Sequence, residues 1–203
     1  SLPPPMLEQR IQQHFIDSAD LKYQAAQALG KPIADAVQAV LACITSGGKI
    51  LACGNGPSVA HAQQFAAFCV GGFERERPEL AAVALSSDTA LAMAVAGHGD
   101  IGQQFARQVR ALGQAGDLLL ALCVSGNDAN VIAAVHAAHE RDMTVVVISG
   151  RSGGALASVL RETDVLMCVP HDRAARVREV HALVLHCLCD GVDAQLFGEQ
   201  EIP

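Results

Sequence analysis

Five short apolar runs constrain the fold of this chain more than any other feature of its sequence. They occupy residues 49–53, 81–85, 118–124, 144–148 and 165–169, and each is rich in branched side chains. Such runs are typical of strands that are buried on both faces of a sheet. Helical patterns separate them, at residues 58–70, 89–96, 101–112, 129–141, 154–160 and 174–196. This alternation predicts βαβ units, and therefore an α/β fold with a mostly parallel five-stranded sheet in a three-layer αβα sandwich.

The segment before the first run predicts added N-terminal helices. Apolar residues recur at helical spacing between residues 6 and 29, as Leu7, Ile11, Phe15, Ile16 and Leu21. Gly30 is expected to end this helix. Pro32 suits the first turn of a second helix, which we expect to run to about residue 46.

Composition excludes several classes of protein. The 203 residues fit one domain, and the 51% hydrophobic content excludes a disordered chain. A net charge of −7 argues against direct nucleic-acid binding, which needs clustered Lys and Arg. The longest apolar runs, such as residues 118–124, are too short to span a bilayer, and the N-terminus does not resemble a signal peptide. The seven cysteines lie inside apolar segments, so we expect reduced core thiols in a cytoplasmic protein without a membrane anchor.

Two strand-to-helix turns carry the strongest signal for a ligand site. In parallel sheets, ligands bind beyond the carboxyl ends of the strands at a switch in strand order. The turn at residues 54–58 reads Gly-Asn-Gly-Pro-Ser, and the turn after the third run contains Ser-Gly-Asn. Glycines admit a ligand close to the backbone, and helix N-termini attract anions. Such residues also make ordinary turns and caps. Our candidate ligand-binding residues are Asn55, Gly56, Ser58, Asp88, Ser125 and Asn127.

Several motifs together resemble one known family. They are Gly54–Ser58, Ser125–Asn127, Phe105-Ala-Arg-Gln-Val109, Gly116-Asp-Leu-Leu119 and Arg176-Val-Arg-Glu-Val-His181. The chain is similar, from about residue 7 to residue 197, to the sugar isomerase (SIS) domain of phosphoheptose isomerases and of their relative, the DnaA initiator-associating protein DiaA. The resemblance implies a single SIS domain over residues 1–203, with N-terminal helices over 1–46 and an α/β core over 47–203. It also implies a homotetramer with sugar-phosphate sites between subunits.

The resemblance also implies catalytic positions, most of which differ in this chain. Isomerases of the family interconvert sedoheptulose 7-phosphate and an aldoheptose phosphate. They use a His and a Glu on the helix after Gly-Asn-Gly, and a Gln and a His on the last helix, which together hold zinc and move a proton. Counting along this sequence puts Gln64, Ala67, Arg178 and His186 at these positions. Only His186 is retained, and Arg178 would repel a metal, so we expect no cofactor unless the protein is an isomerase that uses zinc.

The loop after the third run departs from the family as well. The usual Ser-Thr-Ser-Gly-Asn-Ser reads Cys123-Val-Ser-Gly-Asn-Asp128 here. A carboxylate at Asp128 would repel a phosphate at close range. If Asp128 points away, it instead places an acid favourably in the first turn of the following helix.

These departures lead us to expect a non-catalytic, DiaA-like regulatory protein that binds the replication initiator DnaA. Leu196 and Phe197, near the end of the chain, are the predicted anchor for that partner, although they also suit packing within the protein itself. Two alternatives remain open. One is a phosphoheptose isomerase that forms D-glycero-D-manno-heptose 7-phosphate, and the other is a phosphosugar-sensing SIS protein.

Overall fold

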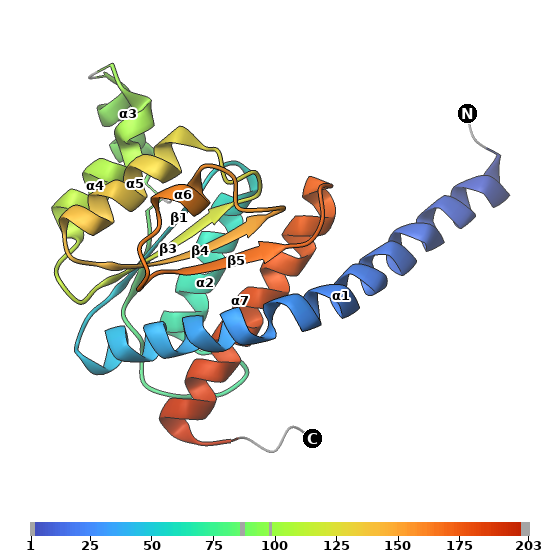
Figure 1. Ribbon diagram of the computed structural model, residues 1–203, viewed down its shortest axis with the longest axis horizontal. Coiled ribbons are helices and arrows are strands. Elements are labelled where there is room, and N and C mark those ends of the chain that lie inside the picture. Colours follow the sequence, from blue (N-terminus) through green and yellow to red (C-terminus); the bar gives the residue numbers. More distant parts are fainter. Residues whose placement is uncertain (1–2, 86–87, 98, 200–203) are drawn as a thin grey trace.

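The computed structural model describes residues 3–85, 88–97 and 99–199, and it contains a five-stranded parallel sheet (Figure 1). The strands are β1 (Ile50–Gly54), β2 (Ala82–Ala84), β3 (Leu118–Cys123), β4 (Thr144–Gly150) and β5 (Val165–Val169). All five lie at the predicted runs, with bounds that differ by at most two residues. The predicted α/β class and parallel sheet are therefore confirmed.

The order of the strands determines where a ligand crevice lies. The sheet runs β2-β1-β3-β4-β5, so the chain leaves β1 toward one edge and then crosses back to β3 on the other side. The carboxyl ends of β1 and β3 are adjacent, since Gly54 pairs in register with Leu122. A reversal of this kind opens a crevice between the two following loops. Those loops contain the two predicted ligand-binding turns.

Side-chain alternation along the strands produces two separate cores. One face of the sheet, which includes Ile50 and Ala52, packs against α1 (Pro4–Thr45), α2 (Pro57–Gly71) and α7 (Ala174–Phe197). The opposite face, which includes Leu51 and Cys53, packs against α4 (Gln104–Leu112), α5 (Ala129–Glu140) and α6 (Leu156–Val159). Figure 1 shows these helices on the two sides of the sheet. Because both faces are covered, the strands are apolar throughout instead of alternating with polar residues.

The N-terminal region is one helix and not the two that the sequence predicted. α1 extends without a break from Pro4 to Thr45 and contains Pro32 in its interior. Gly30 therefore does not end a helix. The buried residues of α1 continue on both sides of Pro32, from Leu21 to Cys43, and they pack on the core that α7 shares. This continuous packing outweighs the local cost of a proline inside a helix.

Smaller differences occur among the helices on the face of the sheet that α5 covers (Figure 1). The segment expected as one helix over residues 101–112 is a 3₁₀ turn, Ile101–Gln103, followed by α4. The helix expected over residues 154–160 is only the four-residue α6. α3 (Thr89–Gly97) lies close to its prediction. Gly153 and Gly154 both have positive φ, so the backbone there forms a loop instead of a first helical turn.

A buried carboxylate ties the beginnings of β1 and β3 together. Asp117 accepts hydrogen bonds from the backbone N–H of Lys49 (2.9 Å), from Lys49 Nζ (2.5 Å) and from the backbone N–H of Gln114 (2.8 Å). Its side chain is 4% exposed and that of Lys49 is 28% exposed. The contact anchors the amino-terminal edge of the two strands whose other ends form the crevice.

In the described part of the chain, two helices, α1 and α7, are long and apolar enough to cross a membrane if only length and composition are considered. The core helices of water-soluble proteins pass the same test. α7 packs along the sheet, and its buried residues belong to the same core as β3 and β4. The expectation of a protein without a membrane anchor stays a prediction.

Candidate functional site

The first turn of the crevice is shaped by two glycines. Gly56 precedes α2 with φ 53° and ψ −126°, a conformation that L-residues rarely adopt. A Cβ on Gly54 would lie 2.7 Å from the Cβ of Ser58 and 2.9 Å from the carbonyl oxygen of Leu122, so only glycine lets β1 approach β3 and α2 this closely. Ser58 is buried in the first turn of α2, and Asn55 is half-buried beside it.

Asn55 joins the two predicted turns through its side chain. Asn55 Nδ2 donates to Asn130 Oδ1 (2.7 Å), and Asn130 Nδ2 donates back to Asn55 Oδ1 (2.8 Å). Asn55 Nδ2 also donates to Asp128 Oδ2 (2.8 Å). The structure therefore brings the turns after β1 and β3 into direct contact, as the sequence predicted. Asn130 was missed, although its place two residues after Asp128 and close to the predicted turn marked it for consideration.

Asp128 lies inside this crevice and does not point away from it. Besides Asn55, the Asp128 carboxylate accepts a hydrogen bond from Ser125 Oγ (3.3 Å). Asp128 precedes α5, but its side chain makes no capping bond to the helix. Of the two orientations that the sequence left open, the one directed toward the loop is correct.

Ser125 and Asn127 have different roles within the second turn. Ser125 Oγ accepts a hydrogen bond from the backbone N–H of Asn127 (3.1 Å), and it is exposed to solvent. Asn127 Oδ1 accepts one from the backbone N–H of Ala155 (2.9 Å), which ties this turn to the loop after β4. A Cβ on Gly126 would lie 1.9 Å from the carbonyl oxygen of Gly153, so these two loops touch backbone to backbone. Asn127 thus holds this turn against the loop after β4.

Asp88 follows β2 in a stretch whose neighbouring residues 86 and 87 lie outside the described part of the chain. Its carboxylate accepts a hydrogen bond from the backbone N–H of Leu91 (3.0 Å). This bond caps the start of α3. Contact of Asp88 with a ligand stays a prediction.

The four positions that the resemblance assigned to catalysis lie along α2 and α7, which pack against each other. Gln64 and Arg178 are half-buried, whereas Ala67 is exposed. The α2 residue that faces His186 is Phe68, four residues after Gln64, with ring centroids 5.7 Å apart. Phe73 stacks on His186 at 5.6 Å, and the Phe68 and Phe73 rings are themselves 5.0 Å apart. The retained histidine is therefore one member of a cluster of three mutually contacting rings.

A pair of histidines lies between the same two helices, closer to the crevice. His61 follows Ser58 by three residues, so the two share a face of α2. The rings of His61 and His181 are 6.5 Å apart. His181 Nε2 lies 3.2 Å from the carbonyl oxygen of Ser149, so this nitrogen carries the proton and donates. The Nδ1 atoms of both histidines are buried without a hydrogen-bond partner.

Burial favours the neutral form of both imidazoles. It lowers the pKa of His181 to about 4, with smaller contributions from His61 and Arg178, although the Ser149 carbonyl acts in the opposite direction. Burial and the Arg178 charge also lower the pKa of His61. Because His181 carries its proton on Nε2, its Nδ1 presents a lone pair. The sequence analysis missed His61, whose spacing from Ser58 was the signal.

The residues at the family's zinc positions do not fit a zinc ion. Arg178 is cationic, Gln64 is a weak amide ligand, and His186 packs against the rings of Phe68 and Phe73. Within residues 3–85, 88–97 and 99–199, no group of three His, Cys, Asp or Glu side chains is arranged to hold a metal. Zinc prefers three or four nitrogen, sulfur or carboxylate ligands. That zinc is not used stays a prediction.

Leu196 and Phe197 are half-buried against their own chain. Leu196 packs on the core beneath α1 and α7. The Arg75 guanidinium lies 5.7 Å from the centre of the Phe197 ring, and Arg75 donates to the carbonyl oxygen of Gly198 (2.8 Å). Packing within the protein, the other role that the sequence allowed, is what the structure shows.

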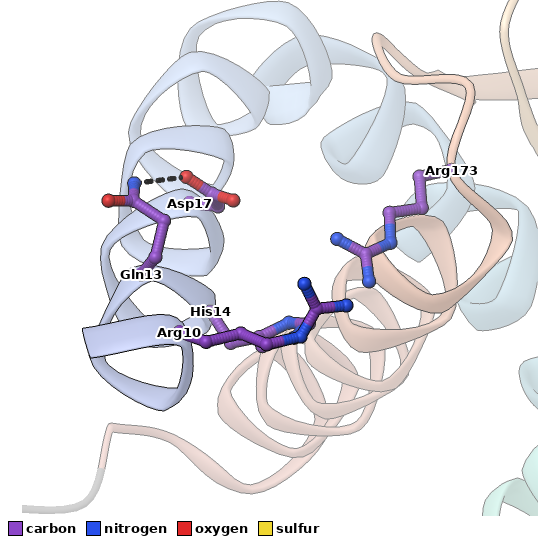
Figure 2. Close-up of a pocket in the computed structure, with 5 residues that line it drawn as sticks. All are labelled: Arg10, Gln13, His14, Asp17 and Arg173. Carbon is purple, nitrogen blue, oxygen red and sulfur yellow. Dashed lines mark hydrogen bonds between the residues drawn. The ribbon is translucent and has the colours of Figure 1, made fainter. Parts of the chain in front are cut away.

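A cavity of about 350 Å³ lies where α1 passes the start of α7. Figure 2 shows its lining residues, with the guanidinium groups of Arg10 and Arg173 directed into the open space and Gln13 bonded to Asp17 (2.7 Å). His14 completes the lining. Most of these side chains are exposed, and none was a predicted site residue. The crevice between β1 and β3 is the better candidate because it combines buried polar groups with the switch in strand order.

Comparison with known proteins decides the family. The SIS domain family matches residues 13–150, which contain both turns of the crevice. The chain belongs to the SIS domain family. A phosphoheptose isomerase from Methylibium petroleiphilum is 64% identical to it over 97% of this chain and 98% of the relative. One from Azoarcus sp. is 54% identical over 95% of this chain and 98% of the relative.

Solved SIS domain structures agree with the fold. Phosphoheptose isomerase GmhA from Neisseria gonorrhoeae superimposes with a TM-score of 0.88 at 48% identity, covering 93% of this chain and 99% of the other. A phosphoheptose isomerase from Francisella tularensis gives a TM-score of 0.86 at 39% identity, covering 91% and 97%. The order of strands and the position of the crevice thus belong to a known SIS architecture.

These similarities correct the main functional prediction. The expectation of a non-catalytic, DiaA-like protein that binds DnaA is wrong, because highly identical relatives over nearly the whole chain are named phosphoheptose isomerases. The DnaA partner and a role in replication initiation have no support. The prediction gave a few altered positions more weight than the similarity along the rest of this SIS domain.

Proposed function

We propose that this protein is an aldose–ketose isomerase of the phosphoheptose isomerase type, with sedoheptulose 7-phosphate as substrate and D-glycero-D-manno-heptose 7-phosphate as product. The observation that carries the proposal is the 64% identity to the Methylibium petroleiphilum phosphoheptose isomerase over 97% of the chain. The crevice at the carboxyl ends of β1 and β3 supports it, since this is where α/β sheets bind ligands.

Three side chains of the crevice are suited to the hydroxyl groups of a sugar. Asn55 offers an amide, and Ser58 and Ser125 offer hydroxyls from the first turn of α2 and the loop after β3. Among the contacts of the described residues the Ser58 hydroxyl makes no hydrogen bond, so it is available to a ligand hydroxyl. Gly56, with its positive φ, leaves room for the sugar close to the backbone.

Aldose–ketose isomerisation moves a proton between adjacent carbons and needs a base that is neutral near pH 7. We assign this role to His61. Its Nδ1 is buried and unpartnered, its pKa is lowered by burial and by Arg178, and it shares a face of α2 with Ser58. Arg178 would stabilise the negative charge that develops on the substrate oxygens when the proton leaves. The hydrogen bond to the Ser149 carbonyl fixes the ring of His181, which would pack against His61 and hold its orientation.

Turnover of sedoheptulose 7-phosphate tests the proposal. The purified protein, with and without added zinc, should form the aldoheptose phosphate, and His61→Asn should reduce kcat at least a hundredfold while KM changes little. His136→Asn is the matched control, because His136 is an exposed histidine of α5 on the far side of the sheet. Absence of turnover under every condition would overturn the proposal. Full activity of His61→Asn would overturn only the assignment of the base.

We also propose that the protein is a homotetramer. None of the residues of α1 before Leu21 is buried, and the helix projects from the body of the protein (Figure 1). The large exposed apolar side chains of this part of the helix are Met6, Leu7, Ile11, Phe15 and Ile16. Such a surface suits burial against further copies of the chain. Light scattering on the eluted protein should give four times the 21.1 kDa chain mass, and a monomer would contradict the proposal.

A cytoplasmic location and the alternative role as a phosphosugar sensor stay predictions. A sensor would bind the heptose phosphate, with a rise in melting temperature, but would not turn it over.

A further inference from the structure

The Asp128 carboxylate occupies hydrogen-bond donors that a ligand would otherwise use. Asn55, from the loop after β1, donates to one oxygen of this carboxylate (2.8 Å). Ser125, from the loop after β3, donates to the other (3.3 Å). The carboxylate therefore joins the loops after β1 and β3, and it engages one side-chain donor from each.

Several other potential donors close to Asp128 are absent or already engaged. Pro57 has no N–H to offer at the start of α2. The backbone N–H of Asn127 donates to Ser125 Oγ, and the N–H of Ala155 donates to the side chain of Asn127. The second donor capacity of Asn55 is used by Asn130. An anion that enters the crevice would have to displace Asp128 to obtain these bonds.

The charge of Asp128 is not compensated by a cationic side chain. Within the described residues, the ion pairs of the protein involve other carboxylates, and Asp128 is held by neutral groups only. A carboxylate without a counter-charge repels a phosphate dianion strongly at short range, and this repulsion is screened little in a half-buried site. A neutral hydroxyl group would experience no such repulsion and could donate a hydrogen bond to the carboxylate.

We propose that Asp128 determines the ligand specificity of this crevice, acting as an internal anion that weakens the binding of phosphate groups relative to neutral, hydroxyl-bearing sugar groups. The inference rests on the proposed function in one respect only, namely that the crevice binds a sugar phosphate. It predicts that removing the charge of Asp128 strengthens the binding of phosphate-containing ligands and leaves neutral sugars unaffected.

Isothermal titration calorimetry on the full chain tests this directly, with sedoheptulose 7-phosphate, inorganic phosphate and unphosphorylated sedoheptulose as probes. Asp128→Ser and Asp128→Asn should each lower the Kd for the two phosphate-containing probes at least tenfold, a difference of about 1.4 kcal/mol. Asp128→Ser keeps a good residue at the start of α5, and Asp128→Asn keeps the shape of the side chain. The Kd for sedoheptulose should change less than twofold.

Two controls separate the charge of Asp128 from other effects. Asp128→Glu keeps the charge and should leave phosphate binding weak. Asp35→Asn removes one negative charge from an exposed site on α1 and should bind all probes like the unmodified protein. Circular dichroism spectra and melting curves establish that each variant is folded.

The outcomes for the inference and for the proposed function are distinct. If Asp128→Ser and Asp128→Asn bind phosphate ligands no more tightly than the unmodified protein, or if no protein in the series binds them at all, the inference is overturned. It is also overturned if sedoheptulose binding tightens equally. Tighter phosphate binding by the variants, in a protein that shows no isomerase turnover, would support the inference while the proposed function fails.

Discussion

Replacing Asp117 by asparagine should destabilise the protein strongly, because this residue ties the beginnings of β1 and β3. Its carboxylate accepts two backbone N–H groups and the Lys49 ammonium, and its side chain is only 4% exposed. Hydrogen bonds to charged groups are worth about 1.5–3 kcal/mol each. An asparagine keeps one acceptor oxygen but turns its NH₂ group toward donors, so two of the three bonds weaken. We expect the free energy of unfolding to fall by about 3 kcal/mol. The loss is not larger because Lys49 regains part of its hydration.

The effect of the substitution should depend on pH. Burial alone would raise the pKa of Asp117, but the hydrogen bonds from Lys49 and Gln114 and the charge of Lys49 together lower it below its ordinary value. A carboxyl group whose pKa is lower in the folded state stabilises that state above its unfolded pKa, and this contribution disappears as pH falls through the folded pKa. The difference between the two proteins should therefore be constant from pH 5 to 8 and shrink below about pH 4.

Urea unfolding at a fixed protein concentration measures this difference, with a fall in melting temperature of roughly 6–12 °C as a second readout. Asp35→Asn is the matched control, since Asp35 forms an exposed pair with Lys31 (2.6 Å), and it should cost less than about 0.5 kcal/mol. A loss below about 1 kcal/mol for Asp117→Asn, or a difference that persists unchanged at pH 3, would refute the reasoning.

Further substitutions test one close backbone contact at the crevice and one buried ion pair between the ends of α2 and α7. Gly126→Ala should cost at least about 3 kcal/mol in urea unfolding, because Gly126 has φ 72° and its Cβ would meet the carbonyl oxygen of Gly153. Gly30 lies inside α1 with open space around it, so Gly30→Ala should instead raise the free energy of unfolding by about 0.5–1 kcal/mol. Equal effects of the two glycine substitutions on unfolding would contradict this account. Arg77→Ala should cost about 3–5 kcal/mol, since Arg77 is 2% exposed and paired with the buried Asp193 (2.8 Å). Arg77→Lys should recover only part of this loss, because lysine cannot also reach the carbonyl oxygens of Phe68 and Cys69; full recovery would show that charge alone matters.

The strands could be predicted because a strand buried on both faces leaves a local signature. A run such as Leu118–Cys123 is apolar at every position, and its short length between two helical patterns favours a buried strand over a buried helix. The contact between Asn55 and the turn after β3 could be anticipated too, since parallel strands present their carboxyl ends at one edge.

α1 could not be predicted as one helix from local rules. Gly30 and Pro32 are both signals of a helix end. They were overridden because α7 and the sheet form a single apolar surface on which both halves of α1 pack, and such a surface exists only after the chain has folded.

Some site residues were equally beyond local reasoning. His61 and His181 are 120 positions apart in the sequence, and only the packing of α2 against α7 places their rings 6.5 Å apart. Phe68 likewise replaces Ala67 as the neighbour of His186, because the rotation of α2 about its axis is set by what it buries.

The sequence by itself determined the α/β class, the five parallel strands and the two turns that form the crevice, because these depend on periodicity and on the conformational freedom of a few glycines. Only the tertiary structure decided what the crevice contains. The orientation of Asp128 depends on Asn55 and Ser125, which approach it from two different loops. Hydrogen bonds between distant segments have no periodic signature, and so the direction of one carboxylate, on which ligand specificity depends, becomes visible only in three dimensions.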